Sequence, residues 1–170
     1  MKSLFLVVAS FLFVQFTYAD YPIVPDESMT PGDTCSRQDR HFDGYRYSAK
    51  IAHCRRKVSR GLKTEIYRAY NIPEKCRRRY TIDHFYPLSI GGNNSIKNLW
   101  PEHKLLKETR LYLEQDVFDN LVQGKITQEE AFRQIHEAKM NPPPQHLQWL
   151  ETYGTECDRA AVQMYRNSQF

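Results

Sequence analysis

The fold of this chain is decided by one stretch, which reads YTIDHFYPLSIGG at positions 80–92 and, after NNSIK, NLWPEH at positions 98–103. Positions 80–85 are rich in β-branched and aromatic residues, which favours a strand. Gly91 and Gly92 then supply a turn. Pro101 suits the first turn of a helix. The stretch therefore predicts a strand, a turn, a short returning strand or loop, and a helix.

The same stretch brings together the side chains that phosphodiester hydrolysis requires. They are one carboxylate, two imidazoles and one carboxamide, from Asp83, His84, His103 and Asn98. An imidazole with a near-neutral pKa can take a proton from an attacking water. A hard divalent cation, held by oxygen or nitrogen ligands, can stabilise the negative charge that develops. These residues are therefore candidates for a hydrolytic metal site.

The order of these residues also resembles the signature of HNH nucleases, a ββα-metal family. The resemblance rests on Asp83-His84, Pro87, Gly91-Gly92, Asn98-Leu99-Trp100-Pro101 and His103. It covers residues 80–138 and is similar to a branch of small HNH proteins. The implied fold class is α+β. It consists of a ββα-metal hairpin-plus-helix core, with the motif at 80–123, embedded in a mostly helical, disulfide-containing domain.

The resemblance implies a role for each of four residues. His84 is expected to be the general base and Asp83 a metal ligand. Asn98 is expected to hold the loop between the two strands and so to fix the base. His103 is expected to be a second metal ligand. The implied cofactor is a divalent metal, Mg²⁺ first, with Mn²⁺ and Zn²⁺ as alternatives.

The second metal ligand departs from the family pattern. In many relatives the ligand lies further along the helix, at a position that Lys107 occupies here. A charged lysine cannot coordinate a metal. Glu102 and Glu108 are therefore alternatives to His103.

The N-terminus has the pattern of an export signal. Lys2 is the charged start, positions 4–16 are almost wholly apolar, and Ala19 is a small residue suited to cleavage. We therefore expect a signal peptide at 1–19, an irregular arm at 20–35 and a single nuclease domain at 36–170. The protein is expected to be secreted or periplasmic, without stable membrane association after cleavage.

The cysteines agree with export. The chain has four, Cys35, Cys54, Cys76 and Cys157, and all follow the expected signal. Four cysteines in an exported chain predict two disulfides, for which three pairings are possible.

Basic residues are concentrated just before the motif. Positions 36–79 hold 14 Lys or Arg against 4 Asp or Glu. Local positive charge attracts nucleic acid through its phosphates. Arg77, Arg78 and Arg79 directly precede the expected strand and are the candidates for clamping phosphates.

Helices are expected around the motif. A weak helical pattern covers 47–62 and a better one covers 63–70, which Pro73 ends. Apolar residues at helical spacing follow Pro101 as far as Gly124. Thr127 is expected to cap a further helix that runs to about position 139.

Together these features predict an exported, metal-dependent HNH endonuclease that cleaves DNA, or less readily RNA, with little sequence preference. Two alternatives belong to other classes. One is an exported nucleic-acid-binding protein with an inactive ββα core, and the other is a disulfide-stapled interaction domain.

Overall fold

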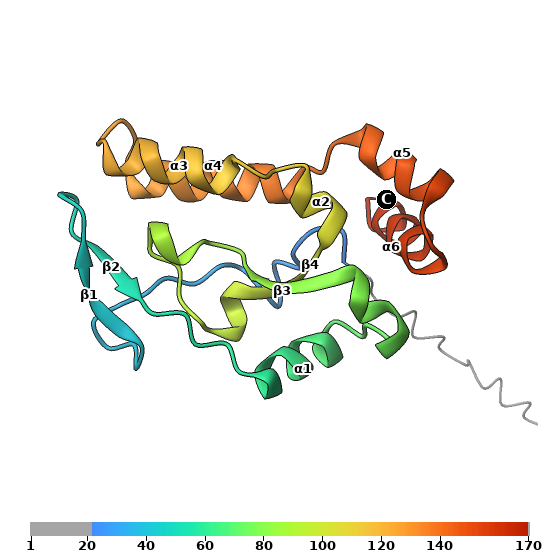
Figure 1. The fold of residues 1–170 in the computed structure, drawn as a ribbon, viewed down its shortest axis with the longest axis horizontal. Helices are drawn as coiled ribbons and strands as arrows, with labels where there is room; N and C mark the ends of the chain where they lie inside the picture. The colour runs from blue at the N-terminus through green and yellow to red at the C-terminus, as the bar shows by residue number, and fades with distance from the viewer. Residues whose placement is uncertain (1–21, 170) are drawn as a thin grey trace, which may run out of the picture.

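The computed structural model of the chain describes residues 22–169, so the expected signal at 1–19 lies outside the described residues. The fold is mixed α+β, as the sequence predicts. Figure 1 shows a hairpin of two strands, β3 and β4, in the centre of the molecule, with α1 on one side and the α3–α4 pair on the other. Within residues 22–169, no helix is both long enough and apolar enough to cross a membrane.

The central hairpin carries the motif. β3 (Tyr80–His84) confirms the strand expected at 80–85, and β4 (Leu99–His103) pairs with it antiparallel. Pro101 lies inside β4, opposite Ile82, so the helix start expected at Pro101 is wrong. Each strand of a two-stranded sheet has a free edge, where the missing N–H of a proline costs no ladder hydrogen bond.

The helices pack around this hairpin. Their bounds are Arg60–Ala69 (α1), Lys104–Glu108 (α2), Leu113–Val122 (α3), Gln128–Met140 (α4), Pro144–Tyr153 (α5) and Glu156–Asn167 (α6). The helix expected after Pro101 is broken into α2 and α3. The cap of α4 is confirmed, because the Thr127 side chain accepts a hydrogen bond from the Glu130 N–H at 3.2 Å.

A second hairpin replaces the weak helix expected at 47–62. β1 (Phe42–Arg46) pairs antiparallel with β2 (Ile51–Cys54). Tyr47 and Lys50 in the connecting turn have φ values of 61° and 52°. These left-handed conformations are uncommon outside glycine, so the sequence carries no ordinary turn signal there.

Three clusters of buried side chains hold the elements together. The first joins α1 to the β3–β4 hairpin and includes Ile66, Ile82 and Trp100. The second packs α3 and α4 on the turn before Gly91. The third packs α5 and α6 on Leu106 of α2. The hairpin is therefore supported from several directions, and its end is held in a fixed position.

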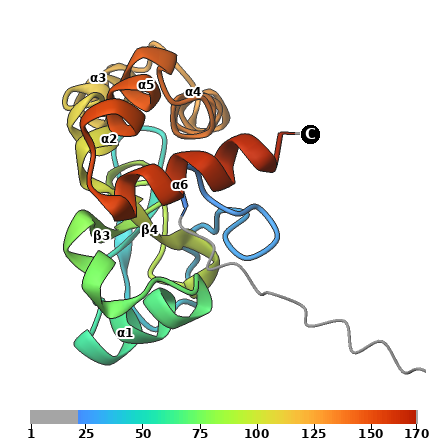
Figure 2. The ribbon, with the colours of Figure 1, turned by 90° about the vertical axis from the view of Figure 1, so that its right-hand side faces the viewer.

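Two disulfides form, as the cysteine count predicts. Cys35 pairs with Cys54, and Cys76 pairs with Cys157. The second bond ties the start of α6 to the segment before β3. Figure 2 shows α6 lying across this side of the molecule, between α1 and the other helices. Two disulfides fit an extracellular protein.

Candidate active site at the end of β3

Asp83 and His84 are the last two residues of β3, and both are buried. Thr81 lies opposite Glu102 in the hairpin, and opposite residues share a face of the sheet. Because side chains alternate along a strand, Asp83 is on the same face as Glu102, whereas His84 is directed to the other face. The two residues can serve one site only where the strand ends.

The His84 ring is held by one asparagine of the loop that follows. Its Nε2 lies 3.3 Å from Oδ1 of Asn94. The Asn94 amide has a fixed orientation, because its Oδ1 accepts from the Lys57 N–H at 3.1 Å and its Nδ2 donates to the Arg55 carbonyl at 2.8 Å. The atom that faces Nε2 is therefore an acceptor, so Nε2 carries the proton and Nδ1 carries the lone pair.

The His84 imidazole is neutral over a wide pH range. The pKa of His84 is lowered from its ordinary value near 6.5 to about 4. Burial is the main cause and the positive charges of Arg56 and Lys139 add to it, while the Asn94 hydrogen bond and the charge of Glu114 oppose it. A neutral imidazole with a free Nδ1 lone pair is the form that accepts a proton.

We predict that the His84 imidazole titrates near pH 4 and shows no change of protonation between pH 5 and 8. An NMR titration of the histidine ring carbons measures this directly, and the spectrum of His84→Gln assigns the signal. The pKa of His84 shifts downward because burial disfavours the charged imidazolium form. A midpoint between pH 6 and 7 would show that the ring is solvated and would contradict the prediction.

Asn98 organises the loop between β3 and β4. Its side chain is fully buried, and Nδ2 donates to the carbonyls of Tyr86 and Asn93 at 2.9 Å each. Its Oδ1 accepts from the Tyr86 N–H at 2.8 Å. Asn98 therefore fixes both arms of the loop that carries Asn94, and through Asn94 it positions the His84 ring.

Lys107 lies between two carboxylates on the other face of the hairpin. Its ammonium forms an ion pair with Asp83 and lies 3.4 Å from Oε2 of Glu102. Arg110 binds the other oxygen, Oε1, at 2.6 Å. Glu102 is almost fully buried, and within the described part of the chain its Oε2 has no hydrogen-bond partner.

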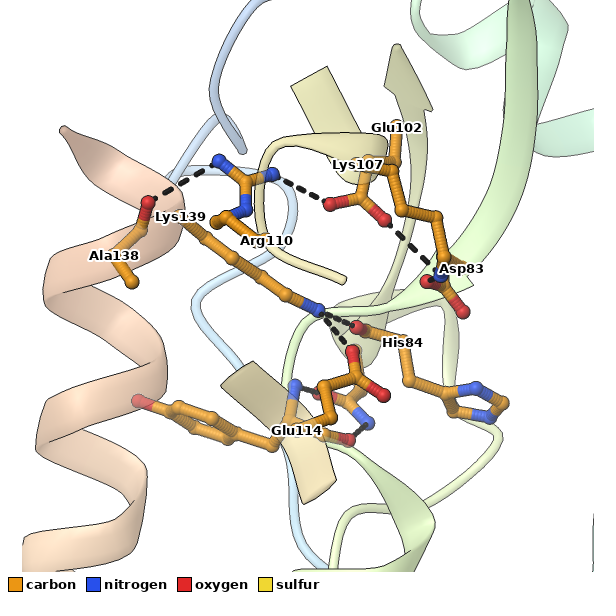
Figure 3. Close-up of polar contacts among 10 residues, drawn as sticks. Asp83, His84, Glu102, Lys107, Arg110, Glu114, Ala138 and Lys139 are labelled. Carbon is orange, nitrogen blue, oxygen red and sulfur yellow. Dashed lines mark hydrogen bonds and ion pairs between the residues drawn. The ribbon is translucent and has the colours of Figure 1, made fainter. Parts of the chain in front are cut away.

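A second ion pair, between α3 and α4, lies next to the end of β3. Lys139 of α4 is buried and donates to the His84 carbonyl at 2.7 Å and to Glu114 of α3 at 3.0 Å. Figure 3 shows Lys139 reaching the backbone of His84, whereas the His84 ring extends away from Lys139. A cavity of about 180 Å³ is lined by Lys107, Glu114, Lys139 and Glu102.

Charged side chains link the two faces at the end of β3. Burial would raise the pKa of Glu114, but the charges of Lys139 and Lys107 outweigh it and lower this pKa. Glu114 and Arg56 each act electrostatically on both His84 and Lys107. The His84 imidazole and the ammonium that pairs with Asp83 and Glu102 are therefore influenced by the same charges, although His84 and Asp83 lie on different faces of the hairpin.

His103 does not join this group. It lies opposite Tyr80, on the face of the hairpin that Asp83 does not share, at the far end of β4. Its Nε2 is 2.8 Å from Oδ1 of Asp158 in α6, and both side chains are completely buried. Burial lowers the pKa of His103 despite this carboxylate. The expectation that His103 and Asp83 share a metal is therefore not supported by their placement.

The three arginines before β3 are also placed away from His84. Arg79 binds the buried Asp158 at 2.7 Å. Arg77 pairs with Glu74 and lies over the ring of Tyr67. Arg78 is exposed. Two of the three are therefore committed to contacts within the fold.

The structure also assigns positions to residues that sequence reasoning missed. Asn94 follows the Gly91-Gly92 turn and was not among the candidate residues, and neither was Lys139. The backbone of residues 55–57 hydrogen-bonds to the Asn94 side chain, which in turn contacts the His84 ring. Its basic composition was visible in the sequence, but its position was not.

The fit of a divalent metal can be judged from the donor set. Within residues 22–169 there is no group of three or more His, Cys, Asp or Glu side chains that could hold a metal ion. Mg²⁺, however, keeps several waters and is bound in proteins through one or two carboxylates. Asp83 and Glu102 face a common cation, the Lys107 ammonium, and Glu102 Oε2 is a buried oxygen without a hydrogen bond. This pair fits a hydrated magnesium ion.

Comparisons of the chain with family models, with curated proteins and with solved structures found no match.

Proposed function

We propose that the chain is an exported, metal-dependent nuclease that hydrolyses phosphodiester bonds of DNA, and less readily of RNA, with His84 as the general base. The observation that carries the proposal is the neutral His84 imidazole, whose Nε2 proton is directed to Asn94 and whose Nδ1 lone pair is left for a water. A histidine held in one tautomer by a fixed amide is suited to proton abstraction.

In the proposed reaction, His84 Nδ1 takes a proton from a water, and the resulting hydroxide attacks the phosphorus atom. The resemblance to HNH nucleases implies that the bond to the 3′ oxygen breaks, so that a 5′-phosphate remains and the departing 3′ oxygen takes a proton from solvent to become a hydroxyl. Asp83 and Glu102 would hold the divalent ion, which supplies Lewis-acid stabilisation of the negative charge. Asn98 and Asn94 hold the imidazole in position.

The arrangement of the elements supports the same proposal. A strand with Asp-His at its end, a Gly-Gly turn, an antiparallel return strand and a helix occur in the order that the resemblance to HNH nucleases implies. The helix residue nearest the carboxylates is Lys107, a cation rather than a ligand. A lysine at the position of the family's metal ligand favours one alternative, namely an exported nucleic-acid-binding protein whose ββα core is inactive.

Cleavage of supercoiled plasmid distinguishes these two functions. The mature, disulfide-bonded protein is incubated with plasmid and Mg²⁺ or Mn²⁺, with and without a chelator. We expect nicked and linear products that the chelator abolishes. Retarded but intact plasmid would support the inactive binding protein, and plasmid that is neither retarded nor cut would exclude both functions.

A further inference from the structure

We infer that the nucleic acid is bound by a basic groove formed by Arg40, Arg55, Arg56 and Lys57, and not by Arg77, Arg78 and Arg79. This inference rests on the proposed function and names the surface that would hold the substrate backbone. Two adjoining hollows, of about 660 Å³ and about 430 Å³, share Arg40, His41 and Lys57 in their walls. We call them together the basic groove.

The charge of the groove matches a phosphate backbone. Four of its lining residues are basic, and Asp39 is the one acidic residue among the described residues that line it. The side chains of Arg40, Arg56 and Lys57 are exposed. Arg55 is exposed as well, although it contacts Asp43 at 3.3 Å. A concave surface with this excess of positive charge attracts polyanions.

The backbone of the basic segment is fixed before any ligand binds. The Arg55 N–H donates to the His41 carbonyl at 3.0 Å. The Arg55 carbonyl and the Lys57 N–H both bind the Asn94 side chain. The disulfide between Cys35 and Cys54 holds the residue directly before the segment. Binding therefore costs little backbone entropy, because three successive basic residues are already held in place.

The groove leads to the candidate base. Asn94 lines the larger hollow and also contacts the His84 ring at 3.3 Å. The charge of Arg56 acts on both His84 and Lys107. In Figure 1 the segment after β2 runs toward α1 and passes beside the loop between β3 and β4. A nucleic-acid strand in the groove would therefore pass close to the His84 imidazole.

The test measures DNA binding without cleavage. A short fluorescein-labelled duplex is titrated with the mature protein in the presence of a chelator, and anisotropy gives the affinity at several salt concentrations. The test variant is Arg55→Ala/Arg56→Ala/Lys57→Ala. The matched control is Arg78→Ala/Lys104→Ala/Lys125→Ala, which removes the same charge from exposed positions outside the groove. Thermal unfolding confirms that both variants fold.

We expect the groove variant to lose at least about tenfold in affinity. The slope of log K against log salt should fall by about two to three, because each phosphate contact contributes about 0.9. The control should bind nearly as the parent protein does. Arg55→Lys/Arg56→Lys should retain most of the affinity, since the charges remain.

Each other outcome overturns the inference. Equal losses in the two triple variants would show that net charge alone matters, and an unchanged groove variant would place the DNA elsewhere. If the parent protein cleaves plasmid while the groove variant binds normally, the inference fails and the nuclease proposal stands. If the parent protein neither binds nor cleaves DNA, both fail together.

Discussion

Plasmid cleavage is expected to slow by about a hundredfold or more when His84 is replaced by alanine, because general bases contribute about that much or more to a rate. The affinity for DNA, measured with a chelator present, should stay nearly unchanged. The imidazole contacts Asn94 and lies close to the basic groove, but Lys57 and the three arginines of the groove are left in place. The measurement is the initial rate of nicking of supercoiled plasmid.

The substitution should leave the loop intact. Asn94 Oδ1 loses the His84 ring but still accepts from the Lys57 N–H, so no acceptor is left without a partner. His84→Gln keeps a side chain of similar length and lacks the base, so it should be equally slow. His136→Ala is the matched control, because His136 is half-buried, pairs with Glu27 and packs its ring against Phe85 rather than against the His84 ring.

Retention of near-wild-type cleavage by His84→Ala would remove this histidine from the mechanism. An equal loss in His136→Ala would trace the effect to general damage of the fold. Asn94→Ala gives an intermediate test, since the imidazole remains but its orientation and tautomer are no longer fixed. We expect this variant to be slower than the parent and faster than His84→Ala.

Local sequence signals account for the parts of the fold that depend on neighbouring residues. β3 was predictable because its β-branched and aromatic residues favour a strand in isolation, and α4 because Thr127 caps it. The β1–β2 hairpin was not predictable, because Tyr47 and Lys50 adopt positive φ in its turn and neither position is a glycine, the usual sequence signal for such a conformation. Helical spacing in this segment therefore gave the wrong structure.

In the candidate site, too, local sequence signals identified some residues, whereas contacts between distant segments were not predictable. Asp83, His84 and Asn98 were candidates because they lie close together in the sequence. The partners that decide their chemistry are remote, since Arg55 meets Asn94 across 39 positions and His103 meets Asp158 across 55. Sequence spacing could not reveal that α6 supplies a buried carboxylate to His103. It also could not show that Lys107 lies between Asp83 and Glu102.

Removal of the Lys107 ammonium is expected to strengthen binding of a divalent metal. In the parent protein a metal at Asp83 and Glu102 has to displace this ammonium, which forms ion pairs with both carboxylates. Lys107→Met keeps the length of the side chain and removes the charge. We expect its dissociation constant for Mn²⁺ to fall by about tenfold, a modest factor because Lys107 is partly exposed and water screens its attraction.

The same variant should couple the metal to stability in a way that the parent protein does not. Without metal, Asp83 loses its cation, so Lys107→Met should unfold at a lower temperature than the parent protein in the presence of a chelator. Mn²⁺ should then raise its unfolding temperature more than it raises that of the parent, because stabilisation grows with the ratio of metal concentration to dissociation constant. Calorimetric titration and thermal unfolding provide the two readouts, neither of which depends on cleavage.

The controls separate the cation position from a general charge effect. Lys104→Met removes the same charge from an exposed position at the start of α2 and should bind Mn²⁺ as the parent protein does. Lys107→Arg keeps a cation between the carboxylates and should not gain affinity. If Lys107→Met and the parent bind Mn²⁺ equally, Asp83 and Glu102 are not the metal ligands. The two carboxylates would then serve to hold Lys107, and metal-dependent cleavage would need ligands elsewhere in the chain.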